Sequence, residues 1–265
     1  MPSPDPLLEV RNLVICYHSP GGWFSSGAPA KAAVDDVSFS IPAGKTAGLV
    51  GESGSGKTTI GRAILNLLPI TSGTITYRGQ TISGLTERQF RHFRREIQIV
   101  FQDPYASLNP RMNVEQILAE PMTLHFPERG KAERQERCVD VLRRVGLPAA
   151  ALRRYPHEFS GGQRQRIGIA RALSVEPRLL VLDEPVSALD VSVQAQIINL
   201  LKDLQEELGL TYLFIGHDLA VVEHLSDQML VLHHGKLVEI GTPEQICQSP
   251  SHPYTQNLLA SVPSL

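Results

Sequence analysis

The sequence predicts an α/β protein whose core strands alternate with helices and whose middle part is helical. Three observations predict this class. Short, nearly continuous apolar runs, typical of buried strands, recur along the chain. A glycine-rich turn follows one of these runs and precedes a segment with helical spacing. Residues 113–173, in contrast, carry almost no strand signal.

Two stretches near the N-terminus alternate apolar with polar residues and are rich in β-branched side chains, LLEVRNLVICY and AVDDVSFSI. This pattern predicts strands of a sheet with one wetter face. The segment between them is rich in Gly, Ser, Pro and Ala, so a loop is expected over residues 18–33. It holds Trp23 and Phe24, and the sequence leaves open whether they form an interface or fold back over the sheet.

The remaining elements follow from short patterns. TAGLV predicts a buried strand that leads through GESGSGKTT into a helix over TTIGRAILNLLP, which Pro69 ends. EIQIVFQD, LLVLD and TYLFIGHD predict further strands, and DQMLVLHHGKLVEI predicts a hairpin that turns at His234 and Gly235. KAERQERCVDVLRRVGL has apolar residues at mostly helical spacing with charges opposite. The tail SPSHPYTQNLLASVPSL predicts a short helix bounded by prolines.

Charge and cysteine content argue against several classes of protein. With 25 basic and 27 acidic residues, the composition gives no electrostatic reason to expect a nucleic-acid partner. Cys16, Cys138 and Cys247 are odd in number and far apart, which argues against a disulfide framework or zinc site and favours a reducing compartment. No apolar run approaches the roughly 20 residues of a membrane span. We therefore expect a soluble, cytoplasmic chain that remains free to dock on a membrane protein.

The segment GESGSGKT, from Gly51 to Thr58, has the spacing of a phosphate-binding loop. Its glycines let backbone amides wrap phosphate oxygens, Lys57 adds a positive charge, and Thr58 offers a hydroxyl to Mg²⁺. The strand before it and the helix after it argue against a chance glycine-rich turn. The loop predicts a P-loop NTPase core, but alone it does not distinguish a kinase, a GTPase or a transport ATPase. The residues assigned to nucleotide binding here are Gly51, Ser53, Gly54, Ser55, Gly56, Lys57, Thr58 and Thr59.

The segment LLVLDE, residues 179–184, supplies acidic groups at the end of a strand. Asp183 is placed to deliver a carboxylate to the water shell of a metal ion. Glu184 beside it can orient or deprotonate a water for in-line attack on a γ-phosphate. In isolation the segment would be a core strand that ends in a polar turn. The phosphate loop on the same chain favours the catalytic interpretation.

Together these motifs resemble the nucleotide-binding subunits of ATP-binding cassette (ABC) transporters, over nearly the whole chain and in the right order. The resemblance implies a RecA-like P-loop NTPase core with an N-terminal antiparallel β subdomain and an inserted α-helical subdomain. It implies one ATP-binding domain over residues 1–265, with the helical subdomain at about 103–175 and a family-type C-terminal tail at about 249–265.

The resemblance also implies roles for single residues. Tyr17 matches the aromatic residue that stacks on adenine, Gln102 the glutamine that senses Mg²⁺ and the attacking water, and His217 the histidine that contacts the γ-phosphate. The segment SALD, Ser187 to Asp190, matches a loop that crosses between two ATP sites, and Asp190 is assigned to nucleotide binding. ATP and Mg²⁺ are the implied ligands. The implied catalytic residues are Glu184, His217 and Gln102, and the implied metal ligands are Thr58, Gln102 and Asp183.

A second glycine-rich turn, FSGGQRQRI, stands where a helix is expected to begin. Unpaired amides at a helix N-terminus favour an anion. In the family that the chain resembles, this signature of one subunit completes the ATP site of the other, so that two subunits sandwich two nucleotides head to tail. The signature residues here are Ser160, Gly161, Gly162 and Gln163. We interpret the nearby Arg164, Arg166 and Arg171 as a solvated or interdomain face, not as a nucleic-acid patch.

Two further stretches, FQDPYASLNPRMNV and HPYTQNLLASVP, are similar to the peptide and nickel importer group. The segment KAAVDDVSFSIPAGKTAGLVGESGSGKTT looks most like the F-type subunit of oligopeptide and dipeptide importers. The resemblance implies an ATPase at the cytoplasmic face of the inner membrane. Its implied partners are a second ATPase subunit of the D-type, two transmembrane permease subunits and an extracytoplasmic substrate-binding protein. Residues 105–111 are expected near the groove for a permease helix, with an ordinary connecting loop as the alternative.

The cargo stays open at this point, because the ATPase subunit does not touch it in this family. Peptide is the expected cargo, and nickel or a metallophore is the alternative within the same importer group. A non-transport ABC ATPase that acts on nucleic acid is a more distant alternative, since the long coiled coils, zinc modules or tandem cassettes of that class do not fit this sequence. Whether the partner ATPase is a second protein or an identical copy is also open.

Overall fold

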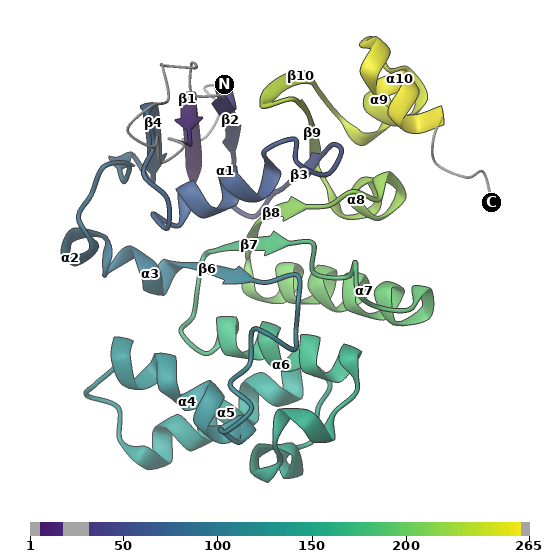
Figure 1. Cartoon of the computed structure of the whole chain (residues 1–265). Helices are drawn as coiled ribbons and strands as arrows, with labels where there is room; N and C mark the ends of the chain where they lie inside the picture. Colours follow the sequence, from purple (N-terminus) through teal and green to yellow (C-terminus); the bar gives the residue numbers. More distant parts are fainter. Residues whose placement is uncertain (1–5, 18–31, 261–265) are drawn as a thin grey trace, which may run out of the picture. The chain divides into compact units, whose positions relative to one another are not determined.

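The computed structural model describes residues 6–17 and 32–260, and the chain divides into two units. The first unit is discontinuous and comprises Met1–Phe90 and Leu213–Leu265, and the second unit is Arg91–Tyr212. In Figure 1 the colours follow the chain out of the first unit, through the second and back. Trp23 and Phe24, whose role the sequence left open, lie outside the described residues.

The first unit begins with an antiparallel sheet in the strand order β2-β1-β4-β5 (Figure 1). The strands are β1 Leu8–Cys16, β2 Ala32–Ile41, β4 Ser72–Tyr77 and β5 Gln80–Thr81. In β1 the apolar residues Leu8, Val10, Leu13 and Ile15 are buried. The apolar residues alternate on each side of an irregularity between Val10 and Leu13, which brings all four to one covered face, and both predicted N-terminal strands are confirmed.

The other strands of the first unit carry the phosphate loop. β3 (Thr46–Val50) is completely buried and pairs in parallel with β9 (Gln228–His233). β9 then pairs antiparallel with β10 (Lys236–Gly241), which confirms the predicted hairpin. The turn residues His234 and Gly235 both have positive φ, 49° and 83°, as a tight hairpin turn requires. The helices of this unit are α1 Lys57–Ile64, α2 Glu87–Phe90, α8 Leu219–Leu225, α9 Pro243–Gln248 and α10 Pro253–Ala260.

α1 ends at Ile64, well before Pro69, so the prediction that Pro69 ends this helix is wrong. The cause is Asn66, which has a left-handed φ of 52° and donates its backbone N–H to the Ala63 carbonyl at 2.9 Å. Its side-chain amide also donates to the Leu85 carbonyl at 3.0 Å. Asparagine tolerates this conformation better than most residues, so it ends the helix without a proline.

The second unit combines a parallel strand pair with packed helices. β6 (Ile97–Val100) pairs with β7 (Leu179–Asp183), with Ile97 opposite Leu179. The described residues between these strands form helices and turns but no strand, as the missing strand signal predicted. The helical elements are α3 Phe93–Glu96, α4 Val114–His125, α5 Lys131–Arg144, η1 Ala149–Arg153, η2 Pro156–Glu158, α6 Gly161–Leu173 and α7 Val191–Leu208. The chain returns to the first unit within β8, Thr211–Ile215.

Two observations concern the membrane-spanning and disulfide-stabilised classes of protein, which the sequence argues against. No helix in the described part of the chain is both long and apolar enough to cross a bilayer. Cys16, Cys138 and Cys247 all carry free thiols. Cys138 is buried in α5, and burial raises the pKa of its thiol to about 12. This thiol is therefore a packing group rather than a reactive one.

Candidate functional site

The phosphate loop of the first unit is shaped by glycines that no other residue could replace without strain. Gly51, Gly54 and Gly56 have φ of 150°, 78° and 111°. A Cβ on Gly51 would lie 2.1 Å from the Leu232 carbonyl oxygen, and one on Gly56 would lie 2.5 Å from the Ala33 carbonyl oxygen. The loop is thus pressed against β9 and the start of β2 on one side.

Lys57, the first residue of α1, has its side chain folded into the loop. Only 5% of the residue is exposed, and Nζ donates to the carbonyl oxygens of Gly51 at 2.6 Å and Glu52 at 2.8 Å. Gly56, the N-cap, offers no side-chain hydrogen bond to the helix start. Within the described residues, the buried Ser55 hydroxyl also has no hydrogen-bond partner. A helix N-terminus without a side-chain cap, together with a positive charge, fits an anion such as a nucleotide phosphate.

Two other predicted residues of the first unit lie at ends of its elements. Tyr17, just after β1, is 52% exposed, and its hydroxyl lies 3.2 Å from the Thr59 hydroxyl of α1 in a hydrogen bond. The structure therefore brings Tyr17 to the beginning of the helix that follows the phosphate loop. His217 is exposed and follows β8, one residue before Asp218, which caps α8 by accepting from Ala220 N at 3.0 Å.

The acidic part of the predicted site lies in the second unit, at the carboxyl ends of β6 and β7. Because the two strands are parallel and in register, the residues that follow them meet at one edge. Gln102, after β6, donates its amide Nε2 to Glu184 Oε2 at 3.0 Å. Residues 82 positions apart in the chain are thus hydrogen bonded, and the sequence alone did not indicate this contact.

Asp183 and Glu184 differ in environment although they are adjacent. Asp183 ends the buried strand and is 7% exposed. Glu184 has a left-handed φ of 48°, which is uncommon for a residue with a side chain. The turn after it is fixed because Ser187 Oγ donates to the Glu184 carbonyl at 3.1 Å. Asp190, the last residue of the SALD segment, is exposed and is the N-cap position of α7.

The donors around these strands suit Mg²⁺, which prefers oxygen ligands and commonly takes only one or two carboxylates beside substrate phosphates and water. The described residues contain no cluster of three or more His, Cys, Asp or Glu side chains that could hold a metal alone. In the second unit, Asp183 provides a carboxylate and Gln102 an amide carbonyl oxygen. Because Gln102 uses its nitrogen toward Glu184, its amide oxygen is the atom of that side chain with the lone pairs that a metal ion needs.

The signature segment forms the beginning of α6, as predicted, and its polar residues satisfy each other. Ser160 is the N-cap: Gln163 N donates to its hydroxyl at 3.4 Å, and Ser160 N donates to Gln163 Oε1 at 3.1 Å. The glycines have a packing role that the sequence did not indicate. A Cβ on Gly162 would lie 2.4 Å from Val193 Cγ1 of α7, so close helix packing requires glycine at this position.

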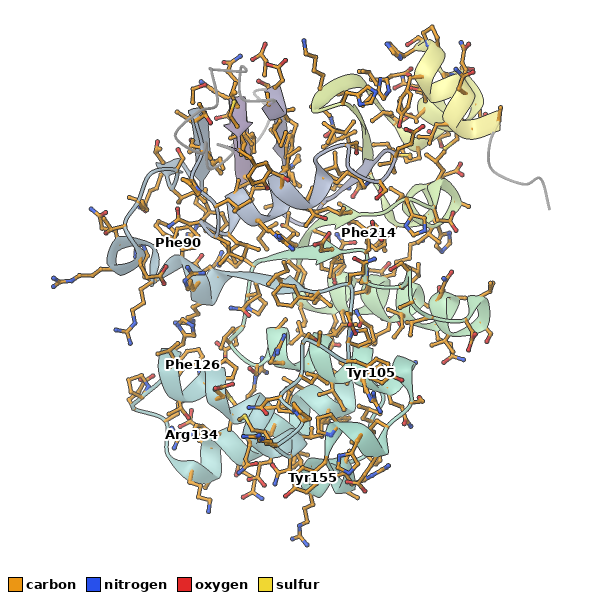
Figure 2. All side chains as sticks on the ribbon, viewed as in Figure 1. Phe90, Tyr105, Phe126, Arg134, Tyr155 and Phe214 are labelled. Carbon is orange, nitrogen blue, oxygen red and sulfur yellow. The ribbon has the colours of Figure 1, made fainter. Side chains whose placement is uncertain are left out.

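The interpretation of the arginines after the signature as a solvated or interdomain face was wrong. Arg164 is 9% exposed, donates to the Pro156 carbonyl at 2.7 Å, and stacks its guanidinium 3.8 Å from the centre of the Tyr105 ring. Figure 2 labels Tyr105. Arg166 donates to the Val145 carbonyl at 2.7 Å, and Arg171 donates to the Ser107 carbonyl. Each arginine therefore satisfies backbone carbonyls within the second unit, and Arg164 and Arg171 join α6 to the segment after Gln102.

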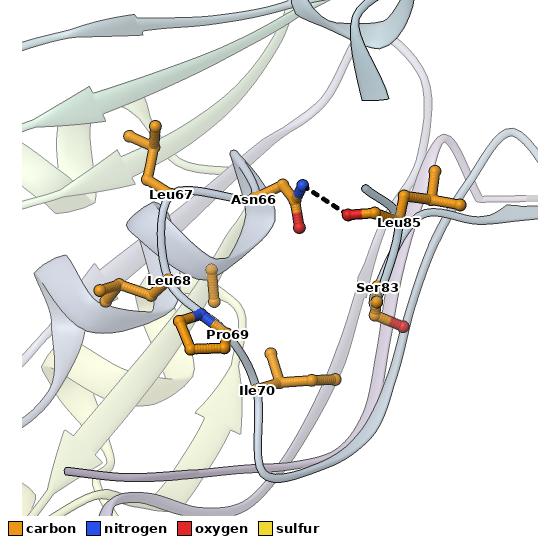
Figure 3. Close-up of a pocket in the computed structure, with 9 residues that line it drawn as sticks. Asn66, Leu67, Leu68, Pro69, Ile70, Ser83 and Leu85 are labelled. Atoms are coloured by element: carbon orange, nitrogen blue, oxygen red, sulfur yellow. Dashed lines mark hydrogen bonds between the residues drawn. The ribbon is translucent and has the colours of Figure 1, made fainter. Parts of the chain in front are cut away.

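Two features of the first unit were not predicted. Tyr254 of α10 accepts a hydrogen bond from the Glu52 backbone N–H of the phosphate loop, at 3.0 Å. A pocket of about 310 Å³ is lined by Ala63, Asn66, Leu67 and Leu85 among others (Figure 3). It lies at the C-terminal end of α1, whereas the phosphate loop is at the N-terminal end, so this pocket is not the phosphate site.

Two protein-family models match the chain. One, described as ABC transporter, matches residues 34–187. The other, described as the C-terminal region of oligopeptide/dipeptide transporters, matches residues 238–265. The first match includes the phosphate loop, Gln102, the signature and Glu184, and the second includes Tyr254.

Known proteins of similar sequence are transport ATP-binding proteins. The chain is 54% identical to the oligopeptide transport ATP-binding protein OppF of Streptococcus mutans, over 97% of this chain and 82% of that protein. It is 51% identical to the dipeptide transport ATP-binding protein DppF of Lactococcus lactis, over 100% of this chain and 83% of that protein.

A solved structure of similar fold is a dimeric ATP-binding cassette in a post-hydrolysis state bound to ADP and Pi. It matches with a TM-score of 0.78 and 27% identity, over 89% of this chain and 98% of that chain. The comparison confirms the predicted fold class, an α/β P-loop NTPase of the cassette type.

Proposed function

The chain belongs to the ABC transporter family of ATP-binding proteins, and from this premise we propose that it is the ATP-hydrolysing subunit of an importer for oligopeptides or dipeptides. The observation that carries the choice of cargo is the match of residues 238–265 to the C-terminal region of oligopeptide/dipeptide transporters, on the same chain as the cassette. The reaction is hydrolysis of ATP to ADP and phosphate.

In this proposal the first unit binds the nucleotide. The amides from Ser53 to Thr59 surround the β- and γ-phosphates, and the Lys57 ammonium neutralises their charge. The buried position of Lys57 supports this role, because a buried ammonium is stabilised by an anion. The exposed ring of Tyr17 stacks on adenine, and its hydrogen bond to Thr59 supports a place beside the loop.

The groups proposed for hydrolysis are Glu184, Gln102 and Asp183 of the second unit, with Thr58 and His217 of the first. Glu184 orients or deprotonates the attacking water, and its hydrogen bond from Gln102 supports this role by fixing the direction of the carboxylate. Thr58, Gln102 and Asp183 are the proposed ligands of Mg²⁺, which neutralises charge on the phosphates when bound. We assign His217 to the γ-phosphate, because its place at the end of β8 leaves the ring exposed.

The signature residues act across an interface in this proposal. Ser160 to Gln163 of one subunit clamp the γ-phosphate held by the phosphate loop of the other, and Asp190 lies in the loop that crosses between the two sites. The position of Ser160 supports this role, because the capping box holds a serine hydroxyl at an exposed helix start.

The proposed partners follow from importer membership. They are two membrane permease subunits, a second ATPase subunit and an extracytoplasmic binding protein, with this chain peripheral on the cytoplasmic face of the membrane. Residues 105–111 are proposed to contact the permease. The stack of Arg164 on Tyr105 supports this assignment, since it connects these residues to the signature helix.

The transporter reconstituted in vesicles with its binding protein tests the cargo. Phosphate release should increase when the binding protein carries a short peptide, and the same complex with Glu184→Gln should stay inactive with either cargo. Stimulation by a nickel chelate and not by peptide would instead assign the chain to metal import. Submicromolar, salt-sensitive binding of DNA or RNA by the isolated chain would contradict transport altogether.

A further inference from the structure

In the first unit, the C-terminal region forms a hydrogen bond with a peptide group of the phosphate loop. The peptide bond between Gly51 and Glu52 has its carbonyl oxygen on the Gly51 side and its N–H on the Glu52 side. The carbonyl oxygen accepts from Lys57 Nζ at 2.6 Å. The N–H donates to the Tyr254 hydroxyl at 3.0 Å. Because the peptide group is planar, both ends turn together.

The Tyr254 ring is held in place by residues outside the loop. It stacks on His233, the last residue of β9, with ring centres 3.8 Å apart and an angle of 19°. The turn before α10 is anchored to β10, because Glu239 accepts from Ser251 N and Ser251 Oγ, both at 2.7 Å, and from His252 N at 3.2 Å. The hydroxyl of Tyr254 therefore stands at a fixed point beside the loop.

The rest of the loop has a backbone support that does not involve α10. Gly235 N of the β9–β10 turn donates to the Ser55 carbonyl at 2.9 Å, and the Leu232 carbonyl packs against Gly51. Glu52, Ser53 and Gly54 are exposed, in contrast. Tyr254 thus supports the exposed side of the loop, next to the carbonyls that receive the lysine.

We infer that Tyr254 is a positioning residue for ATP: its hydroxyl fixes the Gly51–Glu52 peptide group and, through that carbonyl, the Lys57 ammonium. This inference rests on the proposed function of the loop in phosphate binding. It assigns a role in ATP binding to the region that matches the oligopeptide/dipeptide transporter C-terminal model. Tyr254 contacts the loop and not the γ-phosphate. It should therefore stabilise bound ATP equally in the ground state and in the transition state of hydrolysis.

Tyr254→Phe in the full chain tests the inference, because it removes the hydroxyl and keeps the ring on His233. Loss of this one hydrogen bond should lower the affinity for a fluorescent ATP analogue by about 2-fold to 10-fold. In the assembled transporter KM for ATP should rise by a similar factor, with kcat changed less than about 2-fold. Tyr212→Phe is the matched control: its hydroxyl donates to the Leu201 carbonyl at 2.9 Å in the second unit, and its loss should leave ATP affinity unchanged.

A double-mutant cycle separates positioning from general support of the fold. If Tyr254 acts through Lys57, Tyr254→Phe should have little further effect on ATP affinity in a Lys57→Ala background. The inference would be overturned if Tyr254→Phe lowered ATP affinity equally with Lys57 present and with Lys57→Ala. It would also be overturned if the single Tyr254→Phe variant bound ATP with unchanged affinity while the single Lys57→Ala variant bound it weakly. If Lys57→Ala also binds ATP normally, the proposed function of the loop is wrong, and the inference falls with it.

Discussion

The Glu184 side chain is held in two ways, by its own backbone and by a neighbouring amide. The residue has a left-handed φ of 48°, a conformation that costs on the order of 1 kcal/mol or more for a residue with a Cβ. Gln102 then fixes the carboxylate with a hydrogen bond of 3.0 Å. An unfavourable conformation that its surroundings maintain in this way is common at catalytic sites, which agrees with the role we propose for Glu184.

Glu184→Gln should lower the rate of ATP hydrolysis by roughly 10²-fold to 10⁴-fold, because the amide cannot accept a proton, while ATP still binds. Phosphate release and binding of an ATP analogue measure the two effects. Glu176→Gln is a matched control: Glu176 is another left-handed glutamate of the second unit, with φ of 58°, and pairs with Arg129 at 3.0 Å. It should hydrolyse ATP at the normal rate, and a Glu184→Gln chain that also does so would contradict the assignment.

At the scale of helices, the close packing of α6 on α7 depends on one glycine. Gly162→Ala would place a Cβ 2.4 Å from Val193 Cγ1, so the helices must separate or Val193 must move. We expect the free energy of unfolding to fall by about 1 to 3 kcal/mol. Chemical denaturation measures the change.

Gly168→Ala in the same helix provides the control for Gly162→Ala. Apart from the backbone of its own helix, a Cβ at Gly168 meets no atom within 4 Å, and alanine has the higher helix propensity, so this variant should be more stable by up to about 1 kcal/mol. The double variant Gly162→Ala with Val193→Ala should recover part of the lost stability. Equal stability of the Gly162→Ala and Gly168→Ala variants would show that helix packing does not require glycine at residue 162.

The turn before α10 depends on an ionised carboxylate in β10. Burial disfavours ionisation of Glu239, but its polar surroundings, with hydrogen bonds from Ser251 and His252, outweigh this effect and lower the pKa to about 2. A carboxylate whose pKa is lower in the folded than in the unfolded chain stabilises the fold at pH values above its pKa in the unfolded chain. This contribution is lost as the pH falls toward its pKa in the folded chain. The Tm difference between wild type and Glu239→Gln should thus be large at pH 6 and shrink between about pH 4.5 and 2. A difference that stays constant over this range would contradict an ionic anchor.

An element or a contact could be predicted from the sequence when the residues that determine it lie close together in the chain. β3, β7 and the β9–β10 hairpin were predicted because an apolar run and a turn are local signals. β4 was missed although SGTITY alternates, and α9 was also missed. Most candidate site residues could be named from ordered motifs, but the contacts of Gln102 with Glu184 and of Tyr254 with Glu52 depend on strand register and on the docking of α10. The arginines after the signature illustrate the same limit, since their carbonyl partners lie at residues 107, 145 and 156.

At the scale of the whole molecule, the proposed function requires a second ATPase subunit. With hydrolysis blocked, ATP should hold two subunits together, so the Glu184→Gln chain should form a dimer with ATP but not with ADP. Ser160→Arg added to this variant should abolish the dimer and leave ATP binding intact, because the signature acts only across the interface. Light scattering with each nucleotide measures association, in the transporter-bound form if the isolated chain associates too weakly.

Asn113→Arg is the matched control for Ser160→Arg. Asn113 caps α4 with the same reciprocal pattern, accepting from Gln116 N at 2.9 Å. Both changes remove a capping box, at a cost of about 1 kcal/mol, and add the same bulky charge. A dimer that survives Ser160→Arg, or that Asn113→Arg disrupts as strongly, would refute the head-to-tail arrangement.

The discontinuity of the first unit has a consequence for how the protein is made on the ribosome. Thr46 at the start of β3 donates its backbone N–H to Asp227, 181 residues later, and the carbonyl of Leu232 that packs against the phosphate loop comes later still. At about 5 to 20 residues per second, the loop waits roughly 10 to 40 s for these neighbours after it has been synthesised. The second unit is complete before then and has its own strand pair and helices. A nascent chain interrupted before β9 therefore has the glycines and lysine of the loop without the strand against which the loop packs.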